Sequence, residues 1–212
     1  LIANPTEDLP GAAREGERVR DLFRALPDAR LALIEGRAAT RARILAEFDS
    51  GDYDVVHYAG HAAFEPATPR ASGLVVSDGV IGGADLGALA QLPALVFFNA
   101  CESGRVRGAR RGAPGAETAR TSRATALTAG TSVAEAWLRA GIANFIGTYW
   151  PVSDTAAETC AAKFYGALIA GKAIGAALLE ARHAVRARQS PDWADYLHYG
   201  DPLFELKAAS PD

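Results

Sequence analysis

Two short segments of the sequence combine the pattern of a buried strand with a reactive side chain at its end. The segment Val55–Ala62, VVHYAGHA, is mostly apolar up to a turn of small residues that carries His61. The segment Leu95–Gly104, LVFFNACESG, ends in the same manner at Cys101. A thiolate is a strong nucleophile, and a nearby imidazole can hold the thiol proton and later give it to a leaving amine. The two segments therefore predict a cysteine–histidine pair for attack on a carbonyl carbon.

Backbone N–H groups at the same two turns are suited to the next step of this chemistry. When a nucleophile attacks a carbonyl group, negative charge develops on the oxygen, and backbone donors aimed at that oxygen stabilise it. The N–H of Cys101 and that of Ala62, which follows His61, are the candidates. We expect these two groups to form an oxyanion hole.

Two other interpretations of these residues stay open. Cys101 could be a small core residue and His61 a loop histidine, because free cysteine is among the most buried residue types. The polar groups and the glycine around the thiol, in NACESG, are unlike a core site. Alternatively, His57, His61 and Cys101 could ligate zinc, although structural zinc sites usually show closely paired ligands and a fourth one. His57 is expected either to be structural or to support the catalytic residues without reacting itself, and Cys160, among apolar neighbours, is expected to belong to the core.

Alternating strand and helix patterns around these segments predict an α/β fold. Strands are expected at residues 1–3, 29–34, 53–58, 94–98 and 142–147, with a hairpin at 73–81 and a final strand near His198 or Phe204. Helices are expected at residues 11–26, 40–48, 132–140, 154–170 and 174–186, with a helical turn at 85–89 and with Thr40, Ser132 and Asp154 as N-caps. Such an alternation produces a mostly parallel sheet, whose functional sites lie at the carboxyl ends of strands. Both His61 and Cys101 occupy that kind of position.

Composition narrows the class of protein without identifying it. The 212 residues suffice for one α/β domain with a substantial core. The net charge of −3 at pH 7 calls for neither nucleic acid nor an anionic membrane as a partner. Two cysteines make no disulfide framework, and no apolar run could span a bilayer, so a cytoplasmic location is expected. No phosphate-binding or dinucleotide-binding glycine motif has the required setting, and we expect neither cofactor nor metal.

The segment that follows the cysteine turn has an unusual composition. Residues 105–130 are rich in Arg, Gly, Ala and Thr and lack an amphipathic rhythm. Such a segment cannot bury enough apolar area to offset the entropy of ordering, so we expect a mobile, Arg-rich loop. It begins close to Cys101 in the sequence. If the cysteine–histidine pair cuts peptide bonds next to Arg, this segment could itself be a substrate, or it could be a solvated insertion with no regulatory role.

Four blocks of the sequence, in this order, resemble the CHAT domain, a caspase-like cysteine protease domain related to separase. The blocks are HYAGHA, FFNACESG, AGIANFIGTYWPVSD and YLHYGDP, and with IANPTEDLP at the start they cover nearly the whole chain. The resemblance implies one domain over residues 1–212, a three-layer sandwich with a central, mainly parallel six-stranded sheet flanked by helices. It implies His61 as general base and acid, Cys101 as nucleophile, and peptide hydrolysis through an acyl-enzyme thioester.

The resemblance also implies where a substrate binds. In the family, the segment that is here Trp150–Asp154 lines the pocket for the side chain before the scissile bond. Trp150, Asp154 and Glu102 are therefore expected to contact the substrate, and Asp154 could receive an Arg or Lys through a charge-assisted hydrogen bond. Asp154 is equally well placed as a helix N-cap. Ala62 stands where the family usually has glycine after the catalytic histidine, and its N–H remains available.

Two functions from different classes are compatible with these features. The first is a cysteine endopeptidase that cuts a specific protein target, as a regulated module of a larger protein. The second is a CHAT-like scaffold that binds partners without cleaving them, and the presence of both His61 and Cys101 favours the enzyme. The expected partners are a protein substrate and, in the full-length protein, a regulatory partner or the tetratricopeptide repeats that commonly precede CHAT domains.

Overall fold

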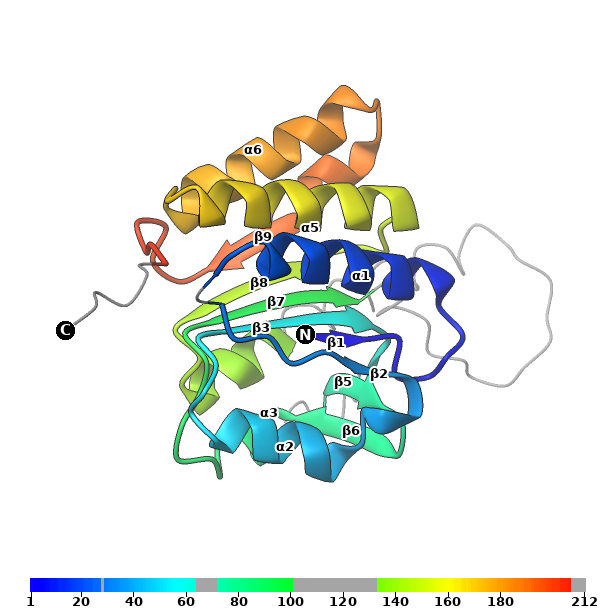
Figure 1. Cartoon of the computed structure of the whole chain (residues 1–212), viewed down its shortest axis with the longest axis vertical. Helices are drawn as coiled ribbons and strands as arrows, with labels where there is room; N and C mark the ends of the chain where they lie inside the picture. The colour runs from blue at the N-terminus through cyan, green and yellow to red at the C-terminus, as the bar shows by residue number, and fades with distance from the viewer. Residues whose placement is uncertain (28, 64–71, 101–132, 207–212) are drawn as a thin grey trace, which may run out of the picture.

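A central sheet of six strands separates two layers of packed elements (Figure 1). The computed structural model describes residues 1–27, 29–63, 72–100 and 133–206. The strand order is β2-β1-β3-β7-β8-β9, and all neighbouring pairs are parallel except β8 with β9. The strands are β1 (Ile2–Ala3), β2 (Ile34–Glu35), β3 (Val55–Gly60), β7 (Leu95–Ala100), β8 (Asn144–Thr148) and β9 (Tyr196–Tyr199). The expected central, mainly parallel six-stranded sheet is thus confirmed.

The two faces of the sheet carry different elements, as Figure 1 shows. One face is covered by three helices, α1 (Pro10–Arg24), α5 (Asp154–Ile169) and α6 (Ile174–Ala187). The other face carries α2 (Arg41–Asp49), α3 (Gly83–Leu86), a helix at residues 133–140, and a small antiparallel sheet of β4 (Ala62–Ala63), β5 (Gly73–Val76) and β6 (Gly79–Gly82). Two 3-10 turns, Gly36–Ala38 and Pro191–Ala194, complete the described elements.

Alternation along the strands explains why both faces are covered. In β7, Val96 and Phe98 pack into the cluster formed with α2 and the helix at 133–140, whereas Leu95 and Phe97 pack into the cluster under α5 and α6. Successive strand residues point to opposite faces, so a strand that is apolar throughout needs cover on both sides. Because β7 contributes side chains to both apolar clusters, it lies at the centre of the core. Full burial of each such side chain contributes about 1.5–3 kcal/mol.

The start of α2 agrees with the prediction from the sequence, whereas β2 is shorter than predicted. Thr40 caps α2 as predicted, because its side chain accepts a hydrogen bond from the N–H of Arg43. The strand predicted at residues 29–34 is confined to Ile34–Glu35. Both of its residues pair with β1, and the N–H of Leu1 donates to the carbonyl of Ala32 just before the strand.

The last strand of the sheet lies close to the end of the described residues. Of the two positions predicted for the final strand, near His198 or near Phe204, the structure has the first, because β9 contains His198. Phe204 lies beyond β9, and its carbonyl accepts a hydrogen bond from the N–H of Ile174 at the start of α6. The Arg-rich segment 105–130 and the predicted cap Ser132 lie outside the described residues. Among the residues that are described, no helix is both long enough and apolar enough to cross a membrane.

Candidate active site

The carboxyl ends of β3 and β7 meet at one edge of the sheet. The two strands are parallel neighbours in register along their whole length, and the last pair is Gly60 with Ala100. The next residues in the sequence are His61 and Cys101, of which only His61 is described. Because neighbouring strands lie about 4.8 Å apart, this register brings the two strand ends together.

The backbone of His61 is held by a buried hydroxyl. The Tyr58 hydroxyl lies 2.5 Å from the carbonyl oxygen of His61 and 2.7 Å from that of Val75, and it shares its one proton between them. The N–H of Val75 donates to the same His61 carbonyl at 3.0 Å. Burial raises the pKa of Tyr58 well above its ordinary value, so the hydroxyl remains protonated and available as a donor. The histidine turn is therefore fixed to both β3 and β5.

The N–H of Ala62 points away from the small antiparallel sheet. Ala62 lies opposite Leu74 in the ladder of β4 and β5. In the preceding pair, the N–H of Val75 donates to the carbonyl of His61. Hydrogen-bonded and non-hydrogen-bonded pairs alternate along an antiparallel ladder, so Ala62 and Leu74 form a non-hydrogen-bonded pair. In such a pair the two N–H groups face away from the partner strand, so the ladder with β5 does not use the donor expected in the oxyanion hole.

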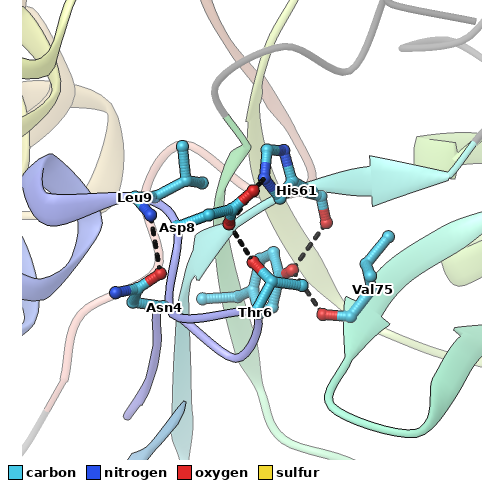
Figure 2. Close-up of polar contacts among 7 residues, drawn as sticks. Asn4, Thr6, Asp8, Leu9, His61 and Val75 are labelled. Atoms are coloured by element: carbon cyan, nitrogen blue, oxygen red, sulfur yellow. Dashed lines mark hydrogen bonds and ion pairs between the residues drawn. The ribbon is translucent and has the colours of Figure 1, made fainter. Parts of the chain in front are cut away.

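A carboxylate that the sequence did not single out contacts the His61 ring. Nε2 of His61 lies 3.0 Å from Oδ1 and 3.1 Å from Oδ2 of Asp8, and the Thr6 hydroxyl donates to the same carboxylate (Figure 2). The hydrogen bond from Thr6 is the main reason why the pKa of Asp8 is lowered, and the contact with His61 adds to it against the effect of burial. An ionised carboxylate only accepts hydrogen bonds, so this contact favours the neutral tautomer with the proton on Nε2, in which Nδ1 is the proton acceptor.

Behind the strand ends, buried polar side chains connect α1 with β3 and β7. Glu15 of α1 is 2% exposed, and its Oε1 accepts a hydrogen bond of 2.8 Å from the side-chain amide of Asn99. The same oxygen lies 3.0 Å from Nε2 of His57, which is not aligned for a hydrogen bond there. Nδ1 of His57 lies 3.2 Å from the hydroxyl of Tyr165, and the hydroxyl of Tyr196 donates to Oδ1 of Asn99 at 3.4 Å. Through Asn99, these contacts tie β7 to α1 and β9, and His57 ties β3 to α5.

This environment bears on the zinc interpretation and on the second cysteine. Both ring nitrogens of His57 face protein groups beneath α1 and α5, which fits the structural role predicted for this residue. In the part of the chain that is described, no three His, Cys, Asp or Glu side chains gather closely enough to hold a metal ion. Cys160 is buried on α5, as predicted, and burial raises its pKa well above the ordinary value, so it stays an unreactive thiol.

The segment after β8 reaches the same edge of the sheet, one strand beyond β7. The ring of Trp150 is partly buried and meets that of Tyr149 edge-on, with the centroids 5.4 Å apart. The prediction that Asp154 caps α5 is wrong, because Ser153 does so: its Oγ accepts the hydrogen bond from the N–H of Ala156. Asp154 is instead the first helical residue, and its carboxylate is not used as a cap.

The Asp154 carboxylate rests on the first turn of α1. Its Oδ2 lies 3.4 Å from Nη2 of Arg14, and both side chains are more than half exposed. A Cβ added at Gly11 would lie 2.1 Å from the Asp154 carboxyl group, so the carboxylate sits directly against the Gly11 backbone. A basic substrate side chain would therefore have to share Asp154 with Arg14. Glu102, the third expected substrate contact, lies outside the described residues.

Comparisons with known proteins agree with this architecture. The family model of the CHAT domain matches residues 1–201. The chain is similar to the crystal structure of the Arg specific cysteine proteinase gingipain R, with a TM-score of 0.68 and 14% identity over 97% of this chain and 46% of that chain. It is also similar to the separase–securin complex of Saccharomyces cerevisiae, with a TM-score of 0.58 and 13% identity over 94% of this chain and 12% of that chain.

The two structural similarities concern the fold and only part of each known protein. At 13–14% identity they show the fold alone, and the chain spans less than half the length of either of these proteins. No curated protein matches the sequence.

Proposed function

Because the chain belongs to the CHAT domain family, we propose that it is a cysteine endopeptidase with Cys101 as nucleophile and His61 as general base and acid. The single observation that carries this proposal is the register of β3 and β7, which pairs Gly60 with Ala100 immediately before the two reactive residues. The caspase-like fold shared with cysteine peptidases supports the same class of reaction.

The proposed reaction follows from the positions of the strand ends. Nδ1 of His61 accepts the Cys101 thiol proton, and the thiolate attacks the peptide carbonyl carbon. The N–H groups of Ala62 and Cys101 stabilise the oxyanion of the tetrahedral intermediate. When the C–N bond breaks, His61 gives its proton to the leaving amine and a thioester remains. Water then attacks the thioester with His61 again as base, which releases the acid product and restores the thiol.

A scaffold that binds partners without cleaving them is the competing function. The contact between Asp8 and His61 favours the enzyme, because a scaffold gains nothing from an imidazole whose tautomer is fixed by a carboxylate. The proposed target is a specific protein, and the domain is proposed to act as a regulated module of a longer chain.

The experiment that tests the proposed function is a search for new protein termini. The full-length protein and its Cys101→Ala variant are each incubated with candidate target proteins, including the products of neighbouring genes. Mass spectrometry then identifies the newly formed amino termini. Cuts that appear with the wild type and not with the variant support a peptidase, whereas identical termini in both samples contradict it.

Asp154 and Trp150 are proposed to border the pocket for the substrate residue before the scissile bond, together with Glu102. If Asp154 receives a basic side chain, Asp154→Asn should lower kcat/KM for Arg and Lys peptides about tenfold, as expected for the loss of a charge-assisted hydrogen bond. Arg14→Gln should have the opposite effect, because it frees the Asp154 carboxylate from its ion pair.

A peptide library that varies only this position measures both effects. The matched pair of variants separates a pocket role from a purely structural one, since the two substitutions break the same exposed ion pair. A preference for small or apolar residues that neither variant changes would exclude Asp154 from the pocket.

A further inference from the structure

We propose that Asp8 is a positioning residue that fixes the tautomer and the orientation of the His61 ring. This inference rests on the proposed function, in which His61 is the general base. Asp8 contributes both carboxylate oxygens to the contact, at 3.0 and 3.1 Å from Nε2 of His61 (Figure 2). The contact joins the turn after β1 to the residue that follows β3, and these two strands are parallel neighbours in the sheet.

The charge pair alone would be weak evidence, because the Asp8 side chain is 61% exposed and surface ion pairs contribute little to stability. The His61 side chain, however, is only 23% exposed, so most of the ring is covered. Its Nε2 edge faces the Asp8 carboxylate. Thr6 also donates a hydrogen bond to Asp8, which restricts the rotation of the carboxylate (Figure 2). The carboxylate is thus oriented from both sides.

The turn that carries Asp8 is built in a strained and tightly bonded conformation. Asn4 and Glu7 have φ values of 45° and 61°, in the left-handed region that residues other than glycine rarely adopt. The N–H of Asn4 donates to the carbonyl of Ala59 at 2.8 Å, and the N–H of Glu7 donates to the carbonyl of Asn4 at 3.1 Å. The N–H of Leu9 donates to Oδ1 of Asn4 at 2.9 Å (Figure 2). Strain of this kind persists where the surrounding structure over-determines it, typically at functional sites.

The chemistry of a carboxylate at Nε2 suits a histidine that acts as a base. The acceptor keeps the proton on Nε2, which leaves the Nδ1 lone pair for the thiol proton. After proton transfer the ring becomes an imidazolium ion, and the adjacent negative charge of Asp8 stabilises it. An amide in the same place can present its NH₂ group to Nε2 and so favour the other tautomer, as in the Asp→Asn variant of the serine-protease triad.

The matched control is a second carboxylate in the same turn. Glu7 forms an ion pair of 3.1 Å with Arg37 at the surface, so Glu7→Gln removes one negative charge from this turn without touching the histidine. We expect Asp8→Asn to lower kcat about 10- to 100-fold with little change in KM, because a misoriented base loses part of its contribution. Glu7→Gln should stay within about twofold of the wild type, as is usual for a surface substitution.

A spectroscopic measurement tests Asp8 without any substrate. In protein labelled with ¹⁵N-histidine and carrying Cys101→Ala, the Nε2–H group of His61 should give a hydrogen-bonded proton resonance, assigned by its loss in His61→Ala. Asp8→Asn should abolish or shift this resonance, whereas Glu7→Gln should preserve it and Asp8→Glu should restore it at least in part. An unchanged resonance and full kcat in Asp8→Asn would overturn the inference. If the wild type cleaves no protein, the proposed function fails, and the resonance still decides the role of Asp8.

Discussion

Cys101→Ala should abolish peptide cleavage while leaving the fold intact. The alanine side chain offers no nucleophile, and the thioester requires a cysteine, whereas Cys160 is buried on α5. The substitution falls just after Ala100, the last residue of β7, so the buried register pairs between β3 and β7 are all kept. His61→Ala should lower the rate about 10²–10⁴-fold, which is the usual contribution of general acid–base catalysis.

Initial rates on a protein substrate and thermal unfolding curves measure these effects together. Cys160→Ala is the matched control, because it removes the other cysteine from a buried position on α5 and should keep the cleavage rate. Robust peptidase activity in purified Cys101→Ala would refute the assignment of the nucleophile. A loss of activity that is equal in Cys160→Ala would show that the thiols act on the fold rather than on the chemistry.

Glu15→Ala should destabilise the protein clearly, although Glu15 is a charged residue of a surface helix. It removes a buried carboxylate that faces His57 and accepts a hydrogen bond from Asn99. The side-chain amide of Asn99 would then remain in the core without its acceptor, and a buried donor left unsatisfied costs about 1–3 kcal/mol. Glu15→Gln should fall between the wild type and Glu15→Ala, since an amide oxygen can still accept from Asn99.

Urea unfolding gives the free energies that decide this prediction. Glu17→Ala supplies the control, because Glu17 is an exposed residue of the same helix and its loss should change stability by no more than about 0.5 kcal/mol. If Glu15→Ala and Glu17→Ala unfold at the same urea concentration, the buried cluster does not stabilise the fold.

The fold could be predicted from the sequence because its signals are local. Fully apolar strands such as residues 95–98 need cover on both faces, and amphipathic segments such as Gly11–Leu26 supply it. The ends of β3 and β7, immediately before His61 and Cys101 in the sequence, followed from the same patterns. The choice between Ser153 and Asp154 as the cap of α5 did not, since both residue types cap helices well.

The contacts that support the site could not be predicted, because they depend on which strands are neighbours. Asp8 follows β1, and only the sheet order shows that β1 lies beside β3 and so places this carboxylate against His61. Glu15 left a partial signal, since it stands four residues before Val19 on the buried side of α1. A charged residue at such a position indicates a buried partner, but the sequence does not reveal that the partners are His57 and Asn99.

The activation of Cys101 by His61 is tested most directly by alkylation with iodoacetamide, followed residue by residue with mass spectrometry. At neutral pH, Cys101 of the wild type should react faster than an ordinary cysteine, whose pKa is about 8.5, and His61→Ala should lower that rate. Cys160 serves as the internal reference, because its burial and raised pKa should keep its reaction slow in both proteins. Equal alkylation rates of Cys101 in the wild type and in His61→Ala would contradict a catalytic pair.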